Sequence, residues 1–503
     1  MSQPLPIALY TAQQVRDLDQ IAIQERGIPG IKLMKSAGRS VFDEINHRWP
    51  GAPITVFCGA GNNGGDGYIV AALALESRLP VQLIQLASPE KLTGDAYTAY
   101  EYAVSAGVPM TPFSDCLDLH IGITAGGVIV DALLGTGLNG QVREPYAQAI
   151  RLINHSGLPV VAVDIPSGLS SDTGAALEAA VEADVTVTFI GLKQGLLTGR
   201  GPALCGELVY NDLSVPADIF GGVKHTATRL DRQGLMASFP SRHRDAHKGD
   251  FGHVLVLGGD EGFGGAVAMA AEAALRTGAG LVSVATRPEH VSAILARRPE
   301  LMVKGVASGQ ELVPLLSSPT VLVVGPGLGQ SPWSEQMLQQ AVSTGLPMVL
   351  DADALNIISG GRVIPNPGNA NWVMTPHPGE AARLLGITSS EVQADRFAAV
   401  RALHKIFKCA VVLKGAGSLV CTAGDQPVGV CTAGNPGMAS GGMGDALSGI
   451  IGALLAQGLP SDIALPMGVC LHAEAADRAV ASDGERGLLA TDLFGPLRQL
   501  VNE

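Results

Sequence analysis

The chain has 503 residues, of which 47% are hydrophobic, so it can bury complete cores in roughly two to four domains. Its formal net charge of −13, without runs of Lys or Arg, argues against a nucleic-acid partner or an anionic membrane surface. Seven widely spaced cysteines without a Cys-x-x-Cys pair predict reduced thiols. The sequence also lacks a signal-peptide pattern and any apolar run long enough to span a bilayer. We therefore expect a cytoplasmic protein. If it binds phosphates, backbone amides and a few placed cations must hold them.

In the first half of the chain, short apolar runs alternate with helical patterns. Helices are predicted over 11–23 and 32–49, and a strand over 54–58 is followed by a Gly-rich segment and a helix over 68–76. Strands follow at 81–87, 128–134, 160–164, 185–190 and 207–213. This alternation predicts a parallel sheet that is covered by helices on both faces.

A second α/β series begins after the pattern lapses around residues 216–230. A boundary near residue 225 gives two domains, 1–224 and 225–503. The second domain contains a predicted helix over 264–276 and strands at 253–257, 281–285, 321–324, 348–350, 372–375 and 410–413. The two halves share no motif, so the sequence does not indicate a duplication.

Three loops of the first domain follow predicted strands and carry polar residues. The first loop, segment 62–67, reads Asn-Asn-Gly-Gly-Asp-Gly and contains only residues that tolerate left-handed backbone geometry. The second loop carries Asp131, and the third carries Asp164 and Ser167. Ligands bind beyond the carboxyl ends of parallel strands. Oxygens of these loops, including Asn63, can hold a monovalent or hard cation, or one Asp can act as acid or base. For any single residue a turn-forming role is the simpler alternative, but all three loops together favour a site.

Segments 60–67, 131–137 and 164–168 resemble, in order, the signature loops of the NAD(P)H-hydrate epimerase family, and the resemblance covers about residues 9–218. That family interconverts the R and S forms of hydrated NADH and NADPH. The resemblance implies an acid/base role for Asp164, and a potassium site formed by Asn63, Asp131 and Ser167. It implies substrate contacts from Asn62, Asn63, Gly64, Gly65, Asp66, Gly135, Thr136, Gly137, Leu138, Asn139, Gly140, Gln141, Tyr146 and Asp164.

In the second domain, the Gly-rich stretch 435–449 leads into a predicted buried helix over 446–457. Several backbone N–H groups and the helix dipole meet at such a turn, which suits a phosphate. Asp445 lies at this turn. It either takes a proton from a hydroxyl that attacks a phosphoryl group or only caps the helix, and the stretch alone leaves both roles open.

Further candidate residues follow predicted strands of the second domain. Gly-rich turns occur at 325–329 and 414–418, and Lys414 suits a nucleotide phosphate. A lone histidine usually has a structural role, but His377 lies between two prolines, and this rigid position strengthens the case for ligand contact. Segment 351–356 can assist Mg²⁺ or cap a helix, and the cap is the safer interpretation. The sequence contains neither a Walker-type phosphate loop nor a zinc motif.

Five segments of the second domain, 325–329, 351–355, 375–380, 413–418 and 435–445, resemble in order the motifs of the NAD(P)H-hydrate dehydratase family. The resemblance covers about residues 226–500, and that family has a ribokinase-like fold. The resemblance implies that ADP, with Mg²⁺, phosphorylates the hydroxyl of the S hydrate and that phosphate loss restores the double bond. Asp445 would be the base, and the 441–444 turn would stabilise the transferring phosphoryl group. Implied hydrate contacts are Ala266, Gly327, His377 and Asp445; implied nucleotide contacts are Lys414, Gly415, Ala416, Gly417, Ser418 and Gly444.

The sequence therefore predicts an α/β protein with an N-terminal Rossmann-like three-layer sandwich and a C-terminal ribokinase-like domain. Its expected function is the repair of hydrated nicotinamide cofactors by epimerisation and ADP-dependent dehydration. ADP is favoured over ATP only through the resemblance, and a homo-oligomer is expected because ribokinase-like domains often associate. Two alternatives are a kinase for another small alcohol, fused to a nucleotide-binding domain, and a regulatory protein with inactive sites. The presence of Asp445, Lys414 and Asp164 argues against inactive sites.

Overall fold

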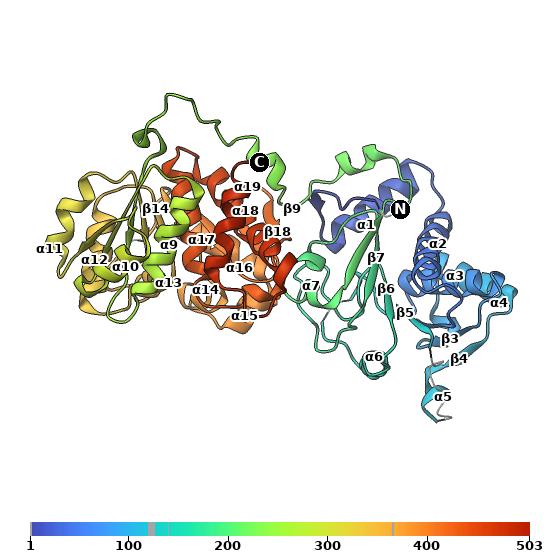
Figure 1. The fold of residues 1–503 in the computed structure, drawn as a ribbon. Coiled ribbons are helices and arrows are strands. Elements are labelled where there is room, and N and C mark those ends of the chain that lie inside the picture. Colours follow the sequence, from blue (N-terminus) through green and yellow to red (C-terminus); the bar gives the residue numbers. More distant parts are fainter. Residues whose placement is uncertain (1–2, 119–125, 139, 365–366) are drawn as a thin grey trace. The chain divides into compact units, whose positions relative to one another are not determined.

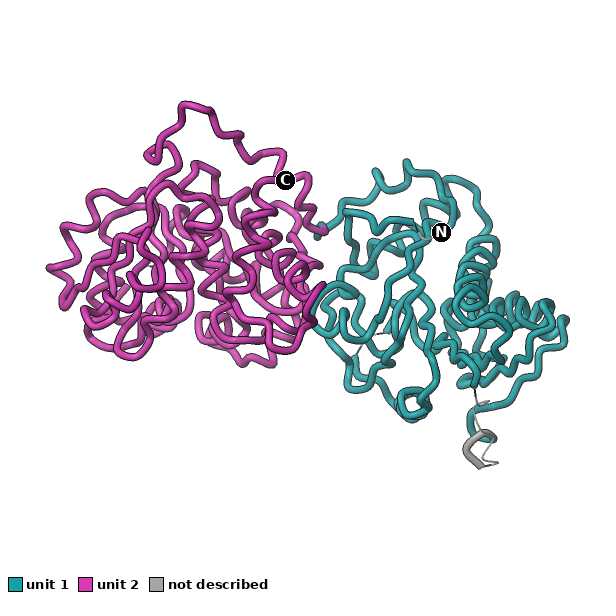
Figure 2. The backbone as a smooth tube through the Cα atoms, in the orientation of Figure 1, with its two compact units in different colours: residues 1–228 teal, residues 229–503 magenta. Residues whose placement is uncertain are grey.

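The computed structural model describes residues 3–118, 126–138, 140–364 and 367–503. The chain forms two compact units, 1–228 and 229–503 (Figure 2). Just beyond the expected boundary near residue 225, strand β9 (Ala227–Arg229) begins, and its residues Ala227 and Thr228 pair antiparallel with β1 (Ala8–Leu9). Within the described residues, no helix is long and apolar enough to cross a membrane.

Unit 1 contains a parallel sheet with the strand order β4-β3-β2-β5-β6-β7-β8. Its strands are β2 (Ile54–Cys58), β3 (Val81–Gln85), β4 (Met110–Pro112), β5 (Val128–Ala132), β6 (Val160–Val163), β7 (Val185–Phe189) and β8 (Glu207–Asn211). Its helices are α1 (Ala12–Gln20), α2 (Gly30–Arg48), α3 (Asn62–Glu76), α4 (Gly94–Ala106), α5 (Phe113–Asp118), α6 (Tyr146–Asn154) and α7 (Gly201–Leu204), with a π-helical turn η1 (Ile21–Glu25) and 3-10 turns η2 (Pro89–Lys91), η3 (Gln194–Leu197) and η4 (Ala217–Gly222).

Side chains that alternate along the strands fill hydrophobic cores on both faces of the unit 1 sheet. Val56 and Cys58 belong to a cluster that also contains residues of α2, α3 and α4. Phe57 and Ile129 belong to a second cluster, which contains residues of α6. The sheet therefore lies between two helical layers, which confirms the expected three-layer arrangement (Figure 1).

The Gly-rich segment 62–67 is not a left-handed loop, and this expectation was wrong. It forms the first turns of α3, which begins at Asn62 rather than at residue 68. The glycines are needed there for close packing: a Cβ at Gly64 would lie 2.1 Å from the carbonyl oxygen of Gly59, and one at Gly65 would lie 2.6 Å from the methyl carbon of Met34. The helix can therefore start directly against the end of β2.

Unit 2 contains a sheet in which β18-β17-β16-β15-β14-β13-β10-β11-β12 are consecutive. Strand β17 pairs antiparallel with both β16 and β18, and the other neighbouring strands pair parallel. The strands are β10 (His253–Leu257), β11 (Leu281–Thr286), β12 (Met302–Gly305), β13 (Val321–Val324), β14 (Met348–Leu350), β15 (Trp372–Met374), β16 (Ala410–Leu413), β17 (Ser418–Cys421) and β18 (Val428–Cys431). The longer helices are α9 (Gly264–Thr277), α12 (Pro332–Ser343), α13 (Ala352–Ser359), α14 (Pro378–Leu385), α16 (Arg396–Phe407), α17 (Met443–Ala456) and α18 (Ser461–Asp483).

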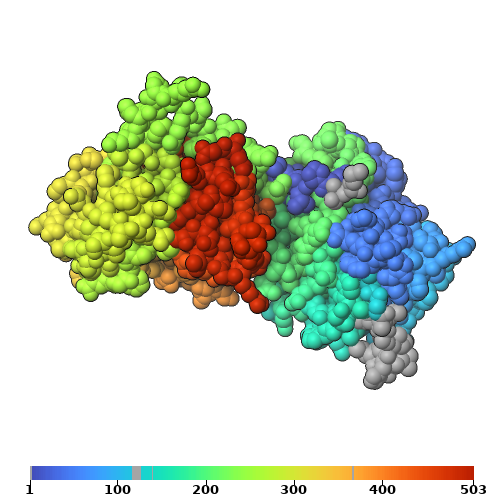
Figure 3. All heavy atoms as spheres, viewed as in Figure 1, coloured from blue at the N-terminus to red at the C-terminus, as the bar shows by residue number. Residues whose placement is uncertain are grey.

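Shorter helices complete unit 2; they are α8 (Arg232–Met236), α10 (Val291–Arg297), α11 (Gly309–Leu312), α15 (Ser389–Ala394), α19 (Phe494–Leu500) and the 3-10 turns η5 (Lys248–Phe251), η6 (Pro288–His290), η7 (Val313–Ser317), η8 (Pro436–Met438) and η9 (Ala490–Leu493). Helix α17 packs tightly against α9 and the sheet. A Cβ at Gly449 would lie 2.0 Å from the carbonyl oxygen of Ala270, and one at Gly452 would lie 2.4 Å from Cγ2 of Val323. The small residues of α17 thus allow its middle to pack closely against α9 and the sheet. Figure 3 shows the last part of the chain, which includes α18 and α19, as one continuous red surface.

Candidate active sites

The three polar loops of unit 1 meet at the carboxyl ends of β2, β5 and β6, which are neighbours in the sheet. The N–H of Gly59 donates to the carbonyl oxygen of Ala132 (3.0 Å), which joins the β2 and β5 loops. A Cβ at Gly135 would lie 3.2 Å from Cβ of Asn63. The structure therefore brings the predicted residues together at the sheet edge where parallel α/β proteins bind ligands.

Asn63, Asp131 and Ser167 form a buried cluster of oxygens. The Ser167 hydroxyl and N–H donate to the Asp131 carboxylate (2.6 and 2.8 Å), and the N–H of Leu133 adds a third hydrogen bond (3.2 Å). Burial nevertheless raises the pKa of Asp131 to about 6, against these hydrogen bonds. Both polar atoms of the buried Asn63 amide lack a partner among the described residues. Because a buried polar group needs a partner, the cluster suits a bound cation.

Asp164 lies just after β6 with a left-handed backbone (φ 65°), a conformation that is uncommon for Asp and marks a constrained position. Its Oδ1 accepts hydrogen bonds from the Lys193 ammonium, the Thr188 hydroxyl (3.3 Å) and the Phe189 N–H (3.2 Å). The same ammonium also donates to the Thr188 hydroxyl and the Phe189 carbonyl, both at 3.1 Å. The carboxylate is therefore held in one orientation from β7 and the loop that follows it.

Lys193 and Asp19 were not predicted from the sequence. Lys193 is fully buried, and Asp19, in α1, lies close enough to feel the charges of Lys193 and Asp164. Burial raises the pKa of Asp19 to about 6. Burial also raises the pKa of Asp66 well above its usual range, and the charges of Asp164 and Asp19 add to this effect. The charge of Lys193 thus acts on both Asp19 and Asp66 and opposes the effect of their burial.

The remaining predicted contacts of unit 1 border this cluster. The Ala60 backbone hydrogen-bonds to Tyr146, at the start of α6, so that side chain lies against the β2 loop. Asn62 is exposed, whereas Gly64 and Gly65 are buried by protein. In the β5 loop, Gly137, Gly140 and Gln141 are exposed, Gly135, Thr136 and Leu138 are partly exposed, and Asn139 lies outside the described residues.

In unit 2, Asp445 lies in the first turn of α17, which begins at Met443 after Gly442 in a left-handed conformation (φ 90°). Burial raises the pKa of Asp445 to about 7; the carboxylates of Asp351 and Asp353 act in the same direction, and Lys414 opposes them. A general base works best when its pKa lies near the working pH. The raised pKa therefore suits Asp445 to act as a base. The helix start on which it lies also favours a bound phosphate.

Lys414 contacts Asp351 beneath the same turn. Its Nζ lies 2.8 Å from Asp351 Oδ1, and the Ser448 hydroxyl donates to Asp351 Oδ2 (2.7 Å). A Cβ at Gly444 would lie 3.2 Å from that Nζ, so Gly444 leaves room for the ammonium group. The expectation that Asp351 caps a helix was wrong: it occupies the N-cap position of α13, but its side chain accepts no hydrogen bond from a described N–H of that helix.

The 414–418 turn is supported by Arg396, whose side chain is buried. Arg396 donates to the carbonyl oxygens of Leu413 and Lys414, both at 3.2 Å. Gly415 and Gly417 have positive φ angles (139° and 60°), and the Ser418 hydroxyl donates to the Gly415 carbonyl (3.0 Å). The predicted nucleotide residues 414–418, including Ala416, therefore form one tight turn, and Gly444 at the start of α17 lies beside its Lys414.

The other predicted hydrate contacts, besides Asp445, follow the carboxyl ends of β10, β13 and β15: Ala266 lies in the first turn of α9, Gly327 in the loop after β13, and His377 just before α14. Gly327 has a positive φ of 56°, and a Cβ there would lie 3.1 Å from Cβ of Ala266. The ring Nδ1 of His377 accepts from the N–H of Gly379 (3.0 Å) and of Glu380 (3.4 Å), which caps α14 and leaves Nε2 as the protonated nitrogen of the neutral ring. Burial, with the charges of Lys414 and Arg383, lowers the pKa of His377.

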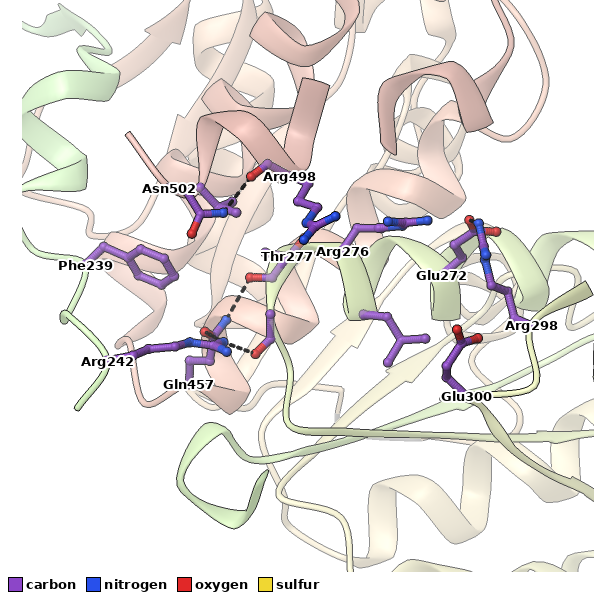
Figure 4. A pocket seen from close by; sticks show the side chains of 13 residues that line it. Phe239, Arg242, Glu272, Arg276, Thr277, Arg298, Glu300, Gln457, Arg498 and Asn502 are labelled. Carbon is purple, nitrogen blue, oxygen red and sulfur yellow. Dashed lines mark hydrogen bonds and ion pairs between the residues drawn. The ribbon is translucent and has the colours of Figure 1, made fainter. Parts of the chain in front are cut away.

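A separate cavity of about 440 Å³ lies at the C-terminal end of α9 (Figure 4). Arg242 is one of the residues that line it, and its guanidinium group donates to the carbonyl oxygen of Gly278 (2.5 Å) and to the side-chain oxygen of Gln457 (3.0 Å). Since the predicted residue Ala266 lies at the other end of α9, and none of the residues that line the cavity was predicted as a site residue, this cavity is distinct from the candidate site of unit 2.

Comparison with known families matches both units. Residues 30–195 match the family described as the YjeF-related protein N-terminus, and residues 254–498 match the family described as NAD(P)H-hydrate dehydratase. Among solved structures, a ribokinase-like superfamily protein from Enterococcus faecalis V583 is 30% identical, with a TM-score of 0.50, over 55% of this chain and 95% of that chain. This similarity confirms the ribokinase-like fold expected for unit 2.

Two relatives match almost the whole chain. The bifunctional NAD(P)H-hydrate repair enzyme of Coxiella burnetii (strain RSA 493 / Nine Mile phase I) is 49% identical over 98% of this chain and 99% of the relative. The enzyme of the same name from Escherichia coli (strain K12) is 42% identical over 99% of this chain and 95% of the relative. The chain belongs to the family of bifunctional NAD(P)H-hydrate repair enzymes.

Proposed function

We propose that unit 1 interconverts the R and S forms of hydrated NADH and NADPH and that unit 2 dehydrates the S form with ADP, giving AMP and inorganic phosphate. The observation that carries this function is the convergence of both predicted residue sets at the carboxyl ends of parallel strands, one set in each unit. Membership of the family supports the pairing of the two activities.

In unit 2, Asp445 takes the proton from the hydrate's hydroxyl group as its oxygen attacks the terminal phosphoryl group of ADP. AMP leaves, and the electron pair of the ring nitrogen then expels inorganic phosphate from the ring carbon. The adjacent ring carbon gives up a proton to the departing phosphate, and this loss restores the double bond. The backbone amides at the start of α17 and the Lys414 ammonium stabilise the charge that develops on the phosphoryl oxygens. The half-exposed ring of His377 contacts the hydrate, and its Nε2 also lies 3.4 Å from Oε1 of Glu380.

In unit 1, protonated Asp66 donates a proton to the departing hydroxyl of the hydrated ring. The ring nitrogen supplies the electron pair as the carbon–oxygen bond breaks, and water then adds to the opposite face. Asp164, oriented by Lys193, takes the proton from that water. The raised pKa of Asp66, caused first by burial, supports its role as the proton donor.

Potassium is the cation we assign to Asn63, Asp131 and Ser167. The partnerless amide of Asn63 supports an ion at this cluster. A single carboxylate among neutral oxygens suits a monovalent ion better than a divalent one. When bound, the ion would fix the loops that carry the substrate contacts.

Magnesium would reach unit 2 with the nucleotide. The described residues include no group of three or more His, Cys, Asp or Glu side chains able to hold a metal. Mg²⁺ commonly binds through one or two carboxylates together with substrate phosphates, and Asp353, whose charge acts on Asp445, provides a carboxylate near the turn. The ion would neutralise phosphate charge.

The test uses the full chain with hydrated NADH, Mg²⁺ and either ADP or ATP, and identifies the products by phosphorus NMR. The proposal expects AMP and inorganic phosphate from ADP, formed only when the hydrate is present. A stable phosphorylated product would instead favour a small-alcohol kinase.

A further inference from the structure

The contact between Asp351 and Lys414 is built from three separate elements of unit 2. Asp351 follows β14, Lys414 follows β16, and Ser448 lies in α17. Both carboxylate oxygens are used: Oδ1 contacts Lys414 Nζ at 2.8 Å, and Oδ2 accepts from the Ser448 hydroxyl at 2.7 Å. The position of the ammonium group is therefore tied to the start of α17.

The pair is open on one side only. The Asp351 side chain is 1% exposed, whereas the Lys414 side chain is 21% exposed. Gly444 packs closely against the pair, because a Cβ at this position would lie 3.2 Å from Lys414 Nζ and 3.4 Å from Asp351 Oδ2. An ammonium group has three N–H donors, and Asp351 uses one of them. The Asp351 carboxylate thus contacts the ammonium group from its buried side, and the other N–H donors of Lys414 remain for a ligand.

A purely structural role for Asp351 as a helix cap does not account for its orientation. Asp231 and Asp395 each accept hydrogen bonds from N–H groups of the helix they precede. Asp351 has the same N-cap position before α13, but its carboxylate is used by Lys414 and Ser448. An Asp at an N-cap normally stabilises its helix by capping it, so this side chain forgoes that contribution.

We propose that Asp351, together with Ser448, is a positioning residue that directs the Lys414 ammonium group toward the phosphates of the nucleotide. Asp351 itself contacts neither nucleotide nor hydrate. The inference rests on the nucleotide site proposed for unit 2, and it extends that site to a residue outside the Gly-rich turns.

The test measures the dissociation constant of ADP for the full chain by calorimetry. Asp351→Asn keeps the shape of the side chain but removes its charge, and should weaken ADP binding by about 10- to 100-fold, the usual effect of losing a residue that orients a ligand-binding group. In the Lys414→Met background the same change should have no further effect. Additive losses would overturn the proposal, because Asp351 would then act independently of Lys414. Asp231→Asn, which alters a true helix cap in the same unit, is the matched control and should bind ADP normally.

Two further measurements keep the test decisive. Ser448→Ala leaves the ion pair intact and should weaken ADP binding by only about two- to fivefold, the order of one lost hydrogen bond. If Asp351→Asn does not fold, unchanged ADP binding by Ser448→Ala overturns the proposal.

In Asp351→Asn the acidic limb of the profile of kcat against pH should move to lower pH, since Asp445 would keep only Asp353 and Lys414 as charged neighbours. If the wild type binds ADP but Asp351→Asn is unchanged, the inference alone fails; if the wild type binds no ADP, the proposed function fails first.

Discussion

The buried ammonium group of Lys193 donates to the carboxylate of Asp164, a residue 29 positions earlier in the chain. The Asp164 side chain is 17% exposed, so it can face a ligand while its partner stays inside the protein. The contact links the loop after β6 with the loop after β7, and it leads to the first of four predictions.

Lys193→Met should slow epimerisation by about 100-fold or more, because Asp164 would lose the group that orients it. The loss of one partner of a buried pair should also destabilise unit 1 by about 3–5 kcal/mol. Interconversion of the R and S hydrates, followed by chromatography, measures the rate. Unchanged dehydration of the S form by the same sample, and normal epimerisation in Lys91→Met at an exposed site, are the controls. Full epimerase activity in Lys193→Met would contradict the role of the pair.

Asp445→Asn should reduce phosphate release by about 10²- to 10⁴-fold, since the amide cannot take the proton of the attacking hydroxyl. Wild-type activity should fall as the pH drops through about 7, the pKa to which burial raises Asp445, because only the ionised carboxylate acts as a base. A stopped assay of phosphate release from pH 5.5 to 9, with the exposed Asp425→Asn as control, measures both effects. A wild-type profile flat across pH 7 would be inconsistent with Asp445 as the base.

Asp445→Asn should also stabilise the fold at alkaline pH. The native pKa of about 7 is above the ordinary value of 3.8, so the native state holds a proton that the unfolded chain releases. Wild-type stability therefore falls as pH rises from about 4 to about 7, a loss of about 1–4 kcal/mol that the neutral amide avoids. Urea unfolding at pH 4 and pH 8 measures the difference. An equal or lower stability of the variant at pH 8 would show that Asp445 is not held in an unfavourable ionised state.

Potassium should raise the melting temperature of the wild type relative to the same concentration of tetramethylammonium, because an ion that binds only the native state stabilises it. Asn63→Leu, which removes the partnerless amide, should abolish this difference and the potassium dependence of epimerisation. Asn154→Leu, at an exposed site in α6, is the control. Equal melting temperatures of the wild type in the two salts would argue against an ion at Asn63, Asp131 and Ser167.

The sequence predicted the layers of both units well, because continuous apolar runs such as 54–58 and 321–324 indicate buried parallel strands. It also placed Asp164 and Asp445 at strand and helix ends, where the structure has them. Segment 62–67 was assigned the wrong geometry, since glycine tolerates both loop and helix. The contacts of Gly64 with Gly59 and of Gly65 with Met34, which decide between them, depend on the assembled fold.

Lys193 and Asp351 show what the sequence could not reveal. Lys193 stands in an apolar segment without a motif. Its partner Asp164 lies in the loop after the neighbouring strand β6, so only the order of strands in the sheet brings them together. A lysine within such an apolar run was the one available signal. Asp351 had a local explanation, helix capping, that was sufficient until the position of Lys414 was known.

The most direct test of the account is the fraction of a mixture of R and S hydrated NADH that the full chain converts to NADH in the presence of ADP, Mg²⁺ and K⁺. Wild type should recover the whole mixture enzymatically, Asp164→Asn should recover only the S portion at the wild-type rate, and Asp445→Asn should recover none while still interconverting the two forms. Recovery of the R portion by Asp164→Asn at the wild-type rate, or NADH formation without phosphate release, would contradict the assignment of one reaction to each unit.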